Sequence, residues 1–382
     1  MEIVLKDLFN CKQGILENKE HVREGANWLV RAHERSPDKG LSRGYYFSLG
    51  WEYSHVGCAG DAAETMFNAS IYLNDVSYRS VAETICDWLV QIQLPCGGFH
   101  RSYVFEKEPR VLNTALAIFG LIRAFEVTNE SIYLDTAVRA GDWVRSVQED
   151  DGTWRKHNFI DKTNIFTYHT KTAYALCRLY SVTGNSTYLE SCTRNLDWAL
   201  TQQLPNGYFR YASMNGDRDP QTHLIAYVLR GLVETGIFIN ESRYISAVER
   251  SMQGIMESHR RYNFIPATYN SNWENYNAFY NEKVTTSCLC GNAEISIVSQ
   301  RLFEYSGGEE YLNFSTILNN ELKTMQDTRC HAENVRGGLK GSSKIYGIYY
   351  ERFAFPNWSV KFFIDAILLE EKNKVHLKGE SS

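Results

Sequence analysis

The sequence predicts an all-α fold, an (α/α)6 toroid of six helical hairpins, and two repeated features carry that prediction. The first is a set of five tyrosines, Tyr78, Tyr133, Tyr188, Tyr244 and Tyr311, which recur at intervals of 55, 55, 56 and 67 residues. Each tyrosine opens a similar amphipathic segment. A fixed period of this size indicates one supersecondary unit that is stacked several times.

The second feature is a turn that closes three of these repeats. A tryptophan follows each of the first three tyrosines by ten residues, and a glutamine and a Gly-aromatic turn follow the tryptophan. The turns read QLPCGGF from Gln93, QEDDGTW from Gln148 and QLPNGYF from Gln203. Glycine accepts the left-handed turn after a helix, and the aromatic ring can fill the gap between hairpins. We therefore interpret these turns as scaffold.

Outer and inner helices are expected to alternate along the chain. The outer helices are expected at about 17–35 and in the segments that the repeat tyrosines open. One of these segments, YLDTAVRAGDWVRSVQ, has one apolar stripe and a charged face. LNTALAIFGLIRAFEVT, from Leu112, is apolar almost all round, as a buried helix is. The inner helices are expected at 58–74, 112–127, 168–183, 221–236, 286–306 and 356–370. The sequence thus predicts one domain over residues 1–372 and a flexible tail at 373–382.

Composition narrows the class of protein. The net charge of −5 and the lack of a basic tract argue against nucleic acid as the main partner. The chain has no apolar run of roughly 18 residues, so we expect no membrane span. Nine cysteines, an odd number without a signal peptide, favour a cytoplasmic location.

The turns resemble the QW-type repeats of the squalene-cyclase and prenyltransferase superfamily, and more broadly α/α-toroid proteins among glycoside hydrolases, polysaccharide lyases and lanthionine cyclases. SCLCGNAEISIVSQRLFEYSGGEEYL, RGGLKGS and FPNWSVKFFIDAILLE are similar to toroid proteins associated with polysaccharide gene clusters. The resemblance implies the toroid scaffold. The Asp-x-Asp-Asp acid motif of class II terpene cyclases is absent, since Glu149-Asp150-Asp151 lies in a repeat turn.

The repeat register predicts a polar ring at one mouth of the toroid. Aligning the inner helices on their closing arginines (Arg123, Arg178, Arg230 and Arg301) brings one N-terminal position onto Asp61, Thr114, His169, Gln221, Asn292 and Asn357. Helix N-termini that converge on a mouth favour anions. Asp, Asn and Thr are also ordinary N-caps, which is the structural alternative, but His169 and Gln221 are poor caps.

This ring and the residues next to it supply candidate catalytic residues, namely Asp61 and His169 of the ring and their neighbours Tyr168 and His223. A neutral base that removes a proton beside a carboxylate, with an acid that returns it, performs β-elimination or epimerisation of a uronate. Candidate substrate-binding residues are Asn113, Gln221, Asn292, Arg336, Lys340 and Trp358. A hydrolase would instead need two carboxyl groups flanking the bond, and Asp61, Glu64, Asp219, Glu294 and Glu351 are available.

Two further motifs bear on ligands. The loop from Arg336 to Ser342 places two cations among three glycines, a composition that suits an anion, although it also fits a plain turn. Cys288, Cys290, Cys330 and His331 resemble the zinc ligands of lanthionine cyclases, but Ala332 replaces the glycine that follows the Cys-His pair there, so we expect no metal and no cofactor.

Four connections, 37–57, 205–220, 258–285 and 327–355, are longer than ordinary loops and are expected to build the site. The sequence therefore favours a metal-independent carbohydrate-active enzyme that binds an anionic saccharide in the mouth and acts as a lyase or epimerase. Three alternatives remain open: a glycoside hydrolase, a non-catalytic saccharide-binding scaffold, and an isoprenoid enzyme.

Overall fold

The computed structural model describes residues 2–8, 13–102, 108–158, 165–214, 216 and 218–379. A short helix, α1 (Glu2–Leu8), precedes two sets of alternating helices. The outer set is α2 (Asn18–Glu34), α4 (Val76–Ile92), α6 (Ser131–Ser146), α8 (Ser186–Leu200), α10 (Ser242–Tyr262) and α12 (Glu309–Met325). The inner set is α3 (Val56–Leu73), α5 (Val111–Thr128), α7 (Thr170–Thr183), α9 (Thr222–Ile239), α11 (Leu289–Ser306) and α13 (Asn357–Gly379).

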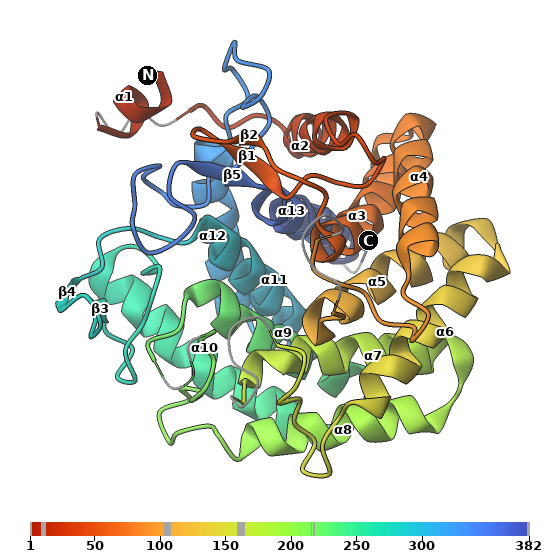
Figure 1. Ribbon diagram of the computed structural model, residues 1–382. Helices are drawn as coiled ribbons and strands as arrows, with labels where there is room; N and C mark the ends of the chain where they lie inside the picture. The colour runs from red at the N-terminus through yellow and green to blue at the C-terminus, as the bar shows by residue number, and fades with distance from the viewer. Residues whose placement is uncertain are drawn as a thin grey trace.

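The inner helices form a closed ring, and the outer helices surround it (Figure 1). Each inner helix packs against the next one along the chain, and α13 packs against both α11 and α3, which closes the ring. The predicted (α/α)6 toroid is confirmed, and the inner spans agree with the sequence to within a few residues. Helix α13 runs to Gly379, so it includes most of the segment that we expected to be a tail.

Short strands occur only in the long connections of the described chain. Strands β1 (Gly44–Tyr46), β2 (Gly50–Trp51) and β5 (Ala354–Pro356) form a sheet in the order β2-β1-β5. Strands β3 (Tyr276–Asn277) and β4 (Glu282–Lys283) form a separate hairpin. The β1–β5 pairing joins the first long loop to the last one, because Tyr45 faces Phe355 across the sheet. Residues about 300 positions apart are thereby held at one edge of the ring (Figure 1).

The repeat tyrosines tie successive outer helices together. The Tyr133 hydroxyl donates to Asp87 Oδ1 at 2.7 Å, and the Tyr188 hydroxyl donates to Asp142 Oδ1 at 2.9 Å. Tyr244 repeats this bond to Asp197 at 2.8 Å. Each tyrosine thus reaches back one outer helix, so the sequence period marks the hairpin-to-hairpin joint.

The Gln-Gly turns lock the same joints. In the second repeat the Gln148 side-chain amide donates to Gly152 O at 3.0 Å and to Ser191 O, on the next outer helix, at 2.9 Å. Gly152 has φ +85°, and a Cβ there would lie 2.5 Å from Arg194 O. Only glycine allows this close approach at a positive φ.

A further copy of this turn closes the ring, and it changes the interpretation of the RGGLKGS loop. Gln326 donates through its side-chain amide to Gly337 O at 3.0 Å and to His21 O at 3.1 Å. Gly337 has φ +80°, and its backbone abuts Glu24 O so closely that a Cβ would clash. The offset from His21 to Glu24 equals that from Ser191 to Arg194. This loop therefore joins the last hairpin to the first, a scaffold role that the sequence spacing had concealed.

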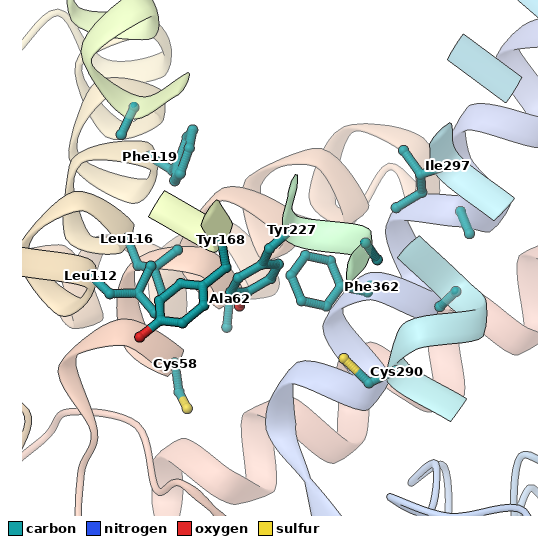
Figure 2. Packing of buried hydrophobic residues seen from close by; sticks show 14 of the residues in the cluster. Cys58, Ala62, Leu112, Leu116, Phe119, Tyr168, Tyr227, Cys290, Ile297 and Phe362 are labelled. Carbon is teal, nitrogen blue, oxygen red and sulfur yellow. The ribbon is translucent and has the colours of Figure 1, made fainter. Parts of the chain in front are cut away.

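Two inner helices are long and apolar enough to cross a membrane by length and composition, namely α5 and α9. Most of each hydrophobic window is buried inside the protein, 72% for α5 and 78% for α9. Their apolar character is thus explained by their place in the core, to which α5 contributes Phe119 and where Tyr227 of α9 packs against Phe362 of α13 (Figure 2).

Candidate active site

A cavity of about 340 Å³ opens at the end of the toroid where the inner helices begin. Its wall comes from the first turns of α3, α5 and α9 and from three of the four long connections that we expected to be functional. The lining residues are Arg43, His55, Gly57, Cys58, Asp61, Arg101, Leu112, Asn113, Leu116, Met214, Gln221, His223, Tyr227, Tyr350, Glu351 and Trp358. We call this cavity the mouth pocket. Its size is in the range of small-ligand sites.

Asp61 brings a carboxylate to the base of the mouth pocket from α3. Its side chain is 4% exposed, and Oδ1 has no hydrogen-bond partner among the described residues. The Lys361 ammonium group lies 3.7 Å from Oδ1 and binds Asp365 more closely, at 2.8 Å. The ammonium group attracts the Asp61 carboxylate without forming a hydrogen bond to it. Asp61 is therefore buried next to a cation with its acceptor oxygen still available.

Asn113 adds two more unsatisfied atoms to the same wall. The side chain is buried on α5, and neither Oδ1 nor Nδ2 has a hydrogen-bond partner in the described chain. A buried amide without partners costs free energy, so such groups in native proteins call for an explanation. A ligand hydroxyl that both donates and accepts would satisfy the amide. Sugars carry several such hydroxyls.

His223 lies across the ring from Asp61, because α3 and α9 are three hairpins apart in a six-membered ring. The imidazole Nδ1 is 2.7 Å from Glu294 Oε1 and 3.0 Å from Cys290 Sγ. Nε2 has no hydrogen-bond partner among the described residues, and His223 lines the mouth pocket. A buried carboxylate that holds one ring nitrogen leaves the other free to exchange a proton with a substrate.

A second carboxylate, Glu351, enters the mouth pocket from the loop before α13. It accepts hydrogen bonds from Arg43 Nη2 and from the Tyr46 hydroxyl, both at 2.7 Å. Burial lowers the pKa of Arg43, but the groups around it, Glu351 first and then Tyr46 and Glu52, together outweigh burial, so the net shift is upward. Glu351 thus forms an ion pair with Arg43, and the Arg43 guanidinium lies 5.2 Å from the Trp358 ring centroid.

His55 caps α3 and lines the mouth pocket as a neutral imidazole. Its Nδ1 accepts from the Cys58 amide at 3.3 Å, so Nε2 carries the proton. Burial, with the nearby charges of Arg101 and Arg43, places the pKa of His55 well below its ordinary value. His55 therefore offers an N–H donor at neutral pH.

Of the ten residues proposed from the sequence as catalytic or substrate-binding, the structure brings five into the mouth pocket: Asp61, Asn113, Gln221, His223 and Trp358. Gln221 donates to Tyr349 O at 3.1 Å, and Trp358 Nε1 donates to the Tyr350 hydroxyl at 2.5 Å. Three of the remaining five, Tyr168, His169 and Asn292, are buried but do not line the pocket.

His169 is held inside the scaffold, contrary to the catalytic role expected from the register. Its Nε2 lies 2.8 Å from Asn158 Oδ1 and its Nδ1 lies 3.0 Å from Thr172 Oγ1, so both nitrogens are engaged. Burial lowers the pKa of His169 to about 3, and burial raises that of Tyr168. Figure 2 shows Tyr168 packed beside Leu112 and Leu116.

The cationic loop also lies away from the mouth pocket. Lys340 is 6% exposed and donates to Asp7 and to Ser343 O. Arg336 is 45% exposed and faces Glu24 on α2. Neither residue lines the pocket, because the Gly337 turn fixes this loop against the first outer helix. The spacing of glycines and cations had suggested an anion site, but in the structure this loop joins the last hairpin to the first.

The described residues contain one group of three side chains that could hold a metal ion, namely His223, Cys290 and Glu294. Cys330 and His331, expected as possible partners of Cys288 and Cys290, are not part of it. Two atoms that both bind one tetrahedral zinc at 2.0–2.1 Å would lie about 3.3 Å apart. The separation of 2.7 Å between His223 and Glu294 is instead that of a hydrogen bond. Zinc analysis of the purified protein tests this; we expect well under one equivalent.

Sequence reasoning missed the roles of Arg43, His55 and Tyr350, and it assigned no pairing between His223 and Glu294. His55 lies six residues before Asp61 in a long connection, so its position could have been inferred from the loop length. The pairing of His223 with Glu294 could not, because it depends on how the side chains of α9 and α11 face each other, and no local sequence pattern gives that.

Comparison with known proteins identifies the family of this chain. The model of the β-L-arabinofuranosidase family, GH127 catalytic domain, matches residues 99–329, which is more than half of the chain. The chain belongs to this family. It is therefore a member of a family of carbohydrate-active enzymes, and not of the squalene cyclases, whose repeat turns it resembles. The matched segment includes Asn113, His223 and Glu294, while Asp61 and Glu351 lie outside it.

Solved structures share the toroid. The crystal structure of an unsaturated glucuronyl hydrolase specific for heparin is 12% identical, with a TM-score of 0.74, covering 94% of this chain and 97% of that one. A sugar epimerase from a ruminal bacterium is 12% identical, with a TM-score of 0.71 and coverage of 91% and 98%. Cellobiose 2-epimerase from Bacillus thermoamylovorans is 11% identical, with a TM-score of 0.68 and coverage of 95% and 97%. At these identities the likeness shows the fold. No curated protein matches the sequence.

Proposed function

We propose that this protein is an exo-acting glycoside hydrolase that removes a terminal sugar held in the mouth pocket. The observation that carries the proposal is the set of buried, unpartnered polar atoms there, Asp61 Oδ1 and both amide atoms of Asn113. These atoms match the donors and acceptors of a sugar ring. Membership in a glycosidase family supports hydrolysis as the reaction.

The size of the mouth pocket favours a chain end over the middle of a polysaccharide. The cavity has a volume of about 340 Å³ and is lined by Tyr227, and the Lys361 side chain beside Asp61 is only 3% exposed. A cavity of this volume favours one terminal sugar over a polymer that threads through the toroid. The glycosidic bond would lie between Asp61 and His223, which both line the pocket.

The two proton-transferring groups are Asp61 and His223, which face each other from opposite sides of the ring. Asp61, in its protonated form, gives a proton to the glycosidic oxygen as the bond between that oxygen and the anomeric carbon breaks. His223 Nε2 takes a proton from the water that bonds to the anomeric carbon. Glu294 acts as a positioning residue, since it holds Nδ1 and stabilises the imidazolium ion that forms.

We extend the proposal to an acidic terminal sugar. Two guanidinium groups, those of Arg43 and Arg101, line the mouth pocket, and arginine suits the planar geometry of a carboxylate. Arg43 already binds Glu351, so a uronate carboxylate would join an existing ion-pair network. Neutral pentofuranosides, to which the family name refers, are the matched alternative substrates.

Epimerisation is the second candidate, and the His223–Glu294 pair favours it. A buried carboxylate behind an imidazole also suits the removal of a proton from a sugar carbon. In that reaction Asp61, in its protonated form, would return the proton on the other face. The sugar would then change configuration at one carbon and no bond between sugars would break.

One assay separates these reactions. The enzyme is incubated in deuterated water with paired aryl glycosides and disaccharides of glucuronic acid, glucose and L-arabinofuranose, and proton NMR follows the products. Release of the free terminal sugar without deuterium at carbon supports hydrolysis, whereas deuterium at one carbon of an intact disaccharide identifies an epimerase. No change in any glycoside would overturn the assignment of an enzyme for these substrates.

A further inference from the structure

A second cavity, of about 750 Å³, opens at the opposite end of the toroid, where the inner helices end. We call it the distal cavity. The four arginines that close the inner helices in the repeat register, Arg123, Arg178, Arg230 and Arg301, all line it. Seven basic side chains and four acidic ones contribute to its wall.

Most of these charges are already paired, so the arginine ring alone does not define a site. Arg178 binds Glu64 at 3.3 Å and Glu126 at 3.2 Å, and Arg301 binds Glu234 at 3.1 Å. Cations near the C-termini of helices also complement the helix dipole. The rim of the distal cavity is therefore accounted for as a structural network.

Two cationic groups deeper in the cavity are not accounted for in this way. Lys171 is 2% exposed and has no hydrogen bond or ion pair among the described residues. Its ammonium nitrogen lies 4.8 Å, 5.3 Å and 5.6 Å from the ring centroids of Phe119, Phe362 and Tyr227. Figure 2 shows the last two rings next to each other. Arg230 Nη1 is buried as well and has no hydrogen-bond partner in the described chain.

The aromatic rings stabilise the ammonium ion only in part. Cation–π contacts contribute roughly 0.5–2 kcal/mol each, but they leave the three N–H donors of a lysine unsatisfied. Burial lowers the pKa of Lys171, with the charges of Lys361 and Arg230 adding to that effect and Asp61 opposing it. An oxyanion beside Lys171 and Arg230 would satisfy the free donors of both.

We propose that the distal cavity binds a small oxyanion, a phosphate or carboxylate group, between Lys171 and Arg230. The site is separate from the mouth pocket, since the two cavities have no lining residue in common. It does not depend on which reaction the mouth pocket performs. Lys361 lies between the two sites, because it lines the distal cavity and is 3.7 Å from Asp61.

Isothermal titration calorimetry in a low-salt chloride buffer tests this with inorganic phosphate, glucose 6-phosphate and free glucuronate as probes. We expect saturable binding of at least one probe, weakened about tenfold or more by Lys171→Met, because a charge-assisted hydrogen bond is lost. Arg230→Gln, at the other cationic group of the proposed site, serves if Lys171→Met does not fold. This variant is also expected to weaken binding of the probe.

Two control variants make the result specific. Lys283→Met removes an equal charge from an exposed strand and should leave binding unchanged. Asn113→Ala alters the mouth pocket and should also leave binding of inorganic phosphate unchanged. The preference among probes tells whether the ligand carries phosphate or carboxylate. Absence of binding by all three probes, or binding that neither Lys171→Met nor Arg230→Gln weakens, would overturn the proposal.

Discussion

The two ends of the toroid are built from the same six helices, yet they treat charge and hydrogen bonding differently. At the C-terminal ends the same residue type, arginine, recurs in four repeats, and nearly every guanidinium has a carboxylate partner. At the N-terminal ends the equivalent positions carry different residues, and Asp61 and Asn113 keep unpaired polar atoms. The site lies where the repeat symmetry is broken.

The largest effect is expected from Asp61→Asn, which removes the proton donor and nearly preserves volume. We expect kcat to fall by about 10²–10⁴-fold, with the protein still folded because Lys361 keeps its bond to Asp365. Asp365→Asn, on the distal side of the same lysine, is the matched control. Equal losses in both variants would indicate that Lys361 pairing, and not proton transfer, underlies the effect.

The second-largest effect is expected on the stability of the scaffold. Gly337→Ala should lower the free energy of unfolding by about 3 kcal/mol or more, because a Cβ clashes with Glu24 O at a positive φ. Gly184→Ala is the control, because Gly184 has φ +68° but an added Cβ would meet no atom within 4 Å. This control should cost only about 1 kcal/mol. If urea unfolding shows similar losses of unfolding free energy in the two variants, the assignment of Gly337 to the ring-closing turn is contradicted.

His169 offers a smaller effect that depends on pH. Its pKa is about 3 in the folded protein because of burial and about 6.5 in the unfolded chain. Between these values only the unfolded chain binds the proton, so stability falls as pH decreases from about 6.5 toward 3. From pH 7 to pH 5 this costs about 2 kcal/mol.

In His169→Gln this contribution to the pH dependence should disappear, whatever the variant loses in absolute stability. Urea unfolding of both proteins at pH 7 and pH 5 measures the difference. If both lose stability equally, His169 does not stay neutral in the fold. A catalytic role would appear instead as a loss of kcat in His169→Gln. We do not expect this loss, because the ring is buried and both of its nitrogens are hydrogen-bonded.

The smallest effect is expected for Arg336→Ala. Arg336 is half-exposed beside α2 and lies outside the mouth pocket, and an exposed ion pair contributes at most about 1 kcal/mol to stability. We therefore expect KM and kcat to stay within about twofold of wild type. A large rise in KM would restore the anion-binding role that the sequence suggested for this loop.

The sequence was sufficient for the fold because hairpin packing repeats, and repetition is visible without coordinates. Tyr133 and Gln148 recur at a fixed period since each makes the same bond to the neighbouring hairpin. Asp61, Asn113 and His223 were found because a register argument places equivalent positions at one mouth. The same argument placed His169 there too, although α7 begins only at Thr170 and the ring of His169 turns into the scaffold.

Other parts of the site depend on contacts between distant segments. Arg43 meets Glu351 only because β1 pairs with β5, and no local pattern indicates that pairing. The ring-closing turn was misread for a related reason. Eleven residues separate Gln326 from Gly337, whereas four separate Gln148 from Gly152, so the bonds agree while the spacing does not.

The most direct test of the central claim is a crystal structure of Asp61→Asn soaked with the glycoside that the wild-type enzyme converts. The account predicts a terminal sugar in the mouth pocket, with a hydroxyl within hydrogen-bond distance of the Asn113 amide and the scissile bond between residue 61 and His223. A sugar bound in the distal cavity, or a mouth pocket that stays empty at saturating ligand, would contradict it.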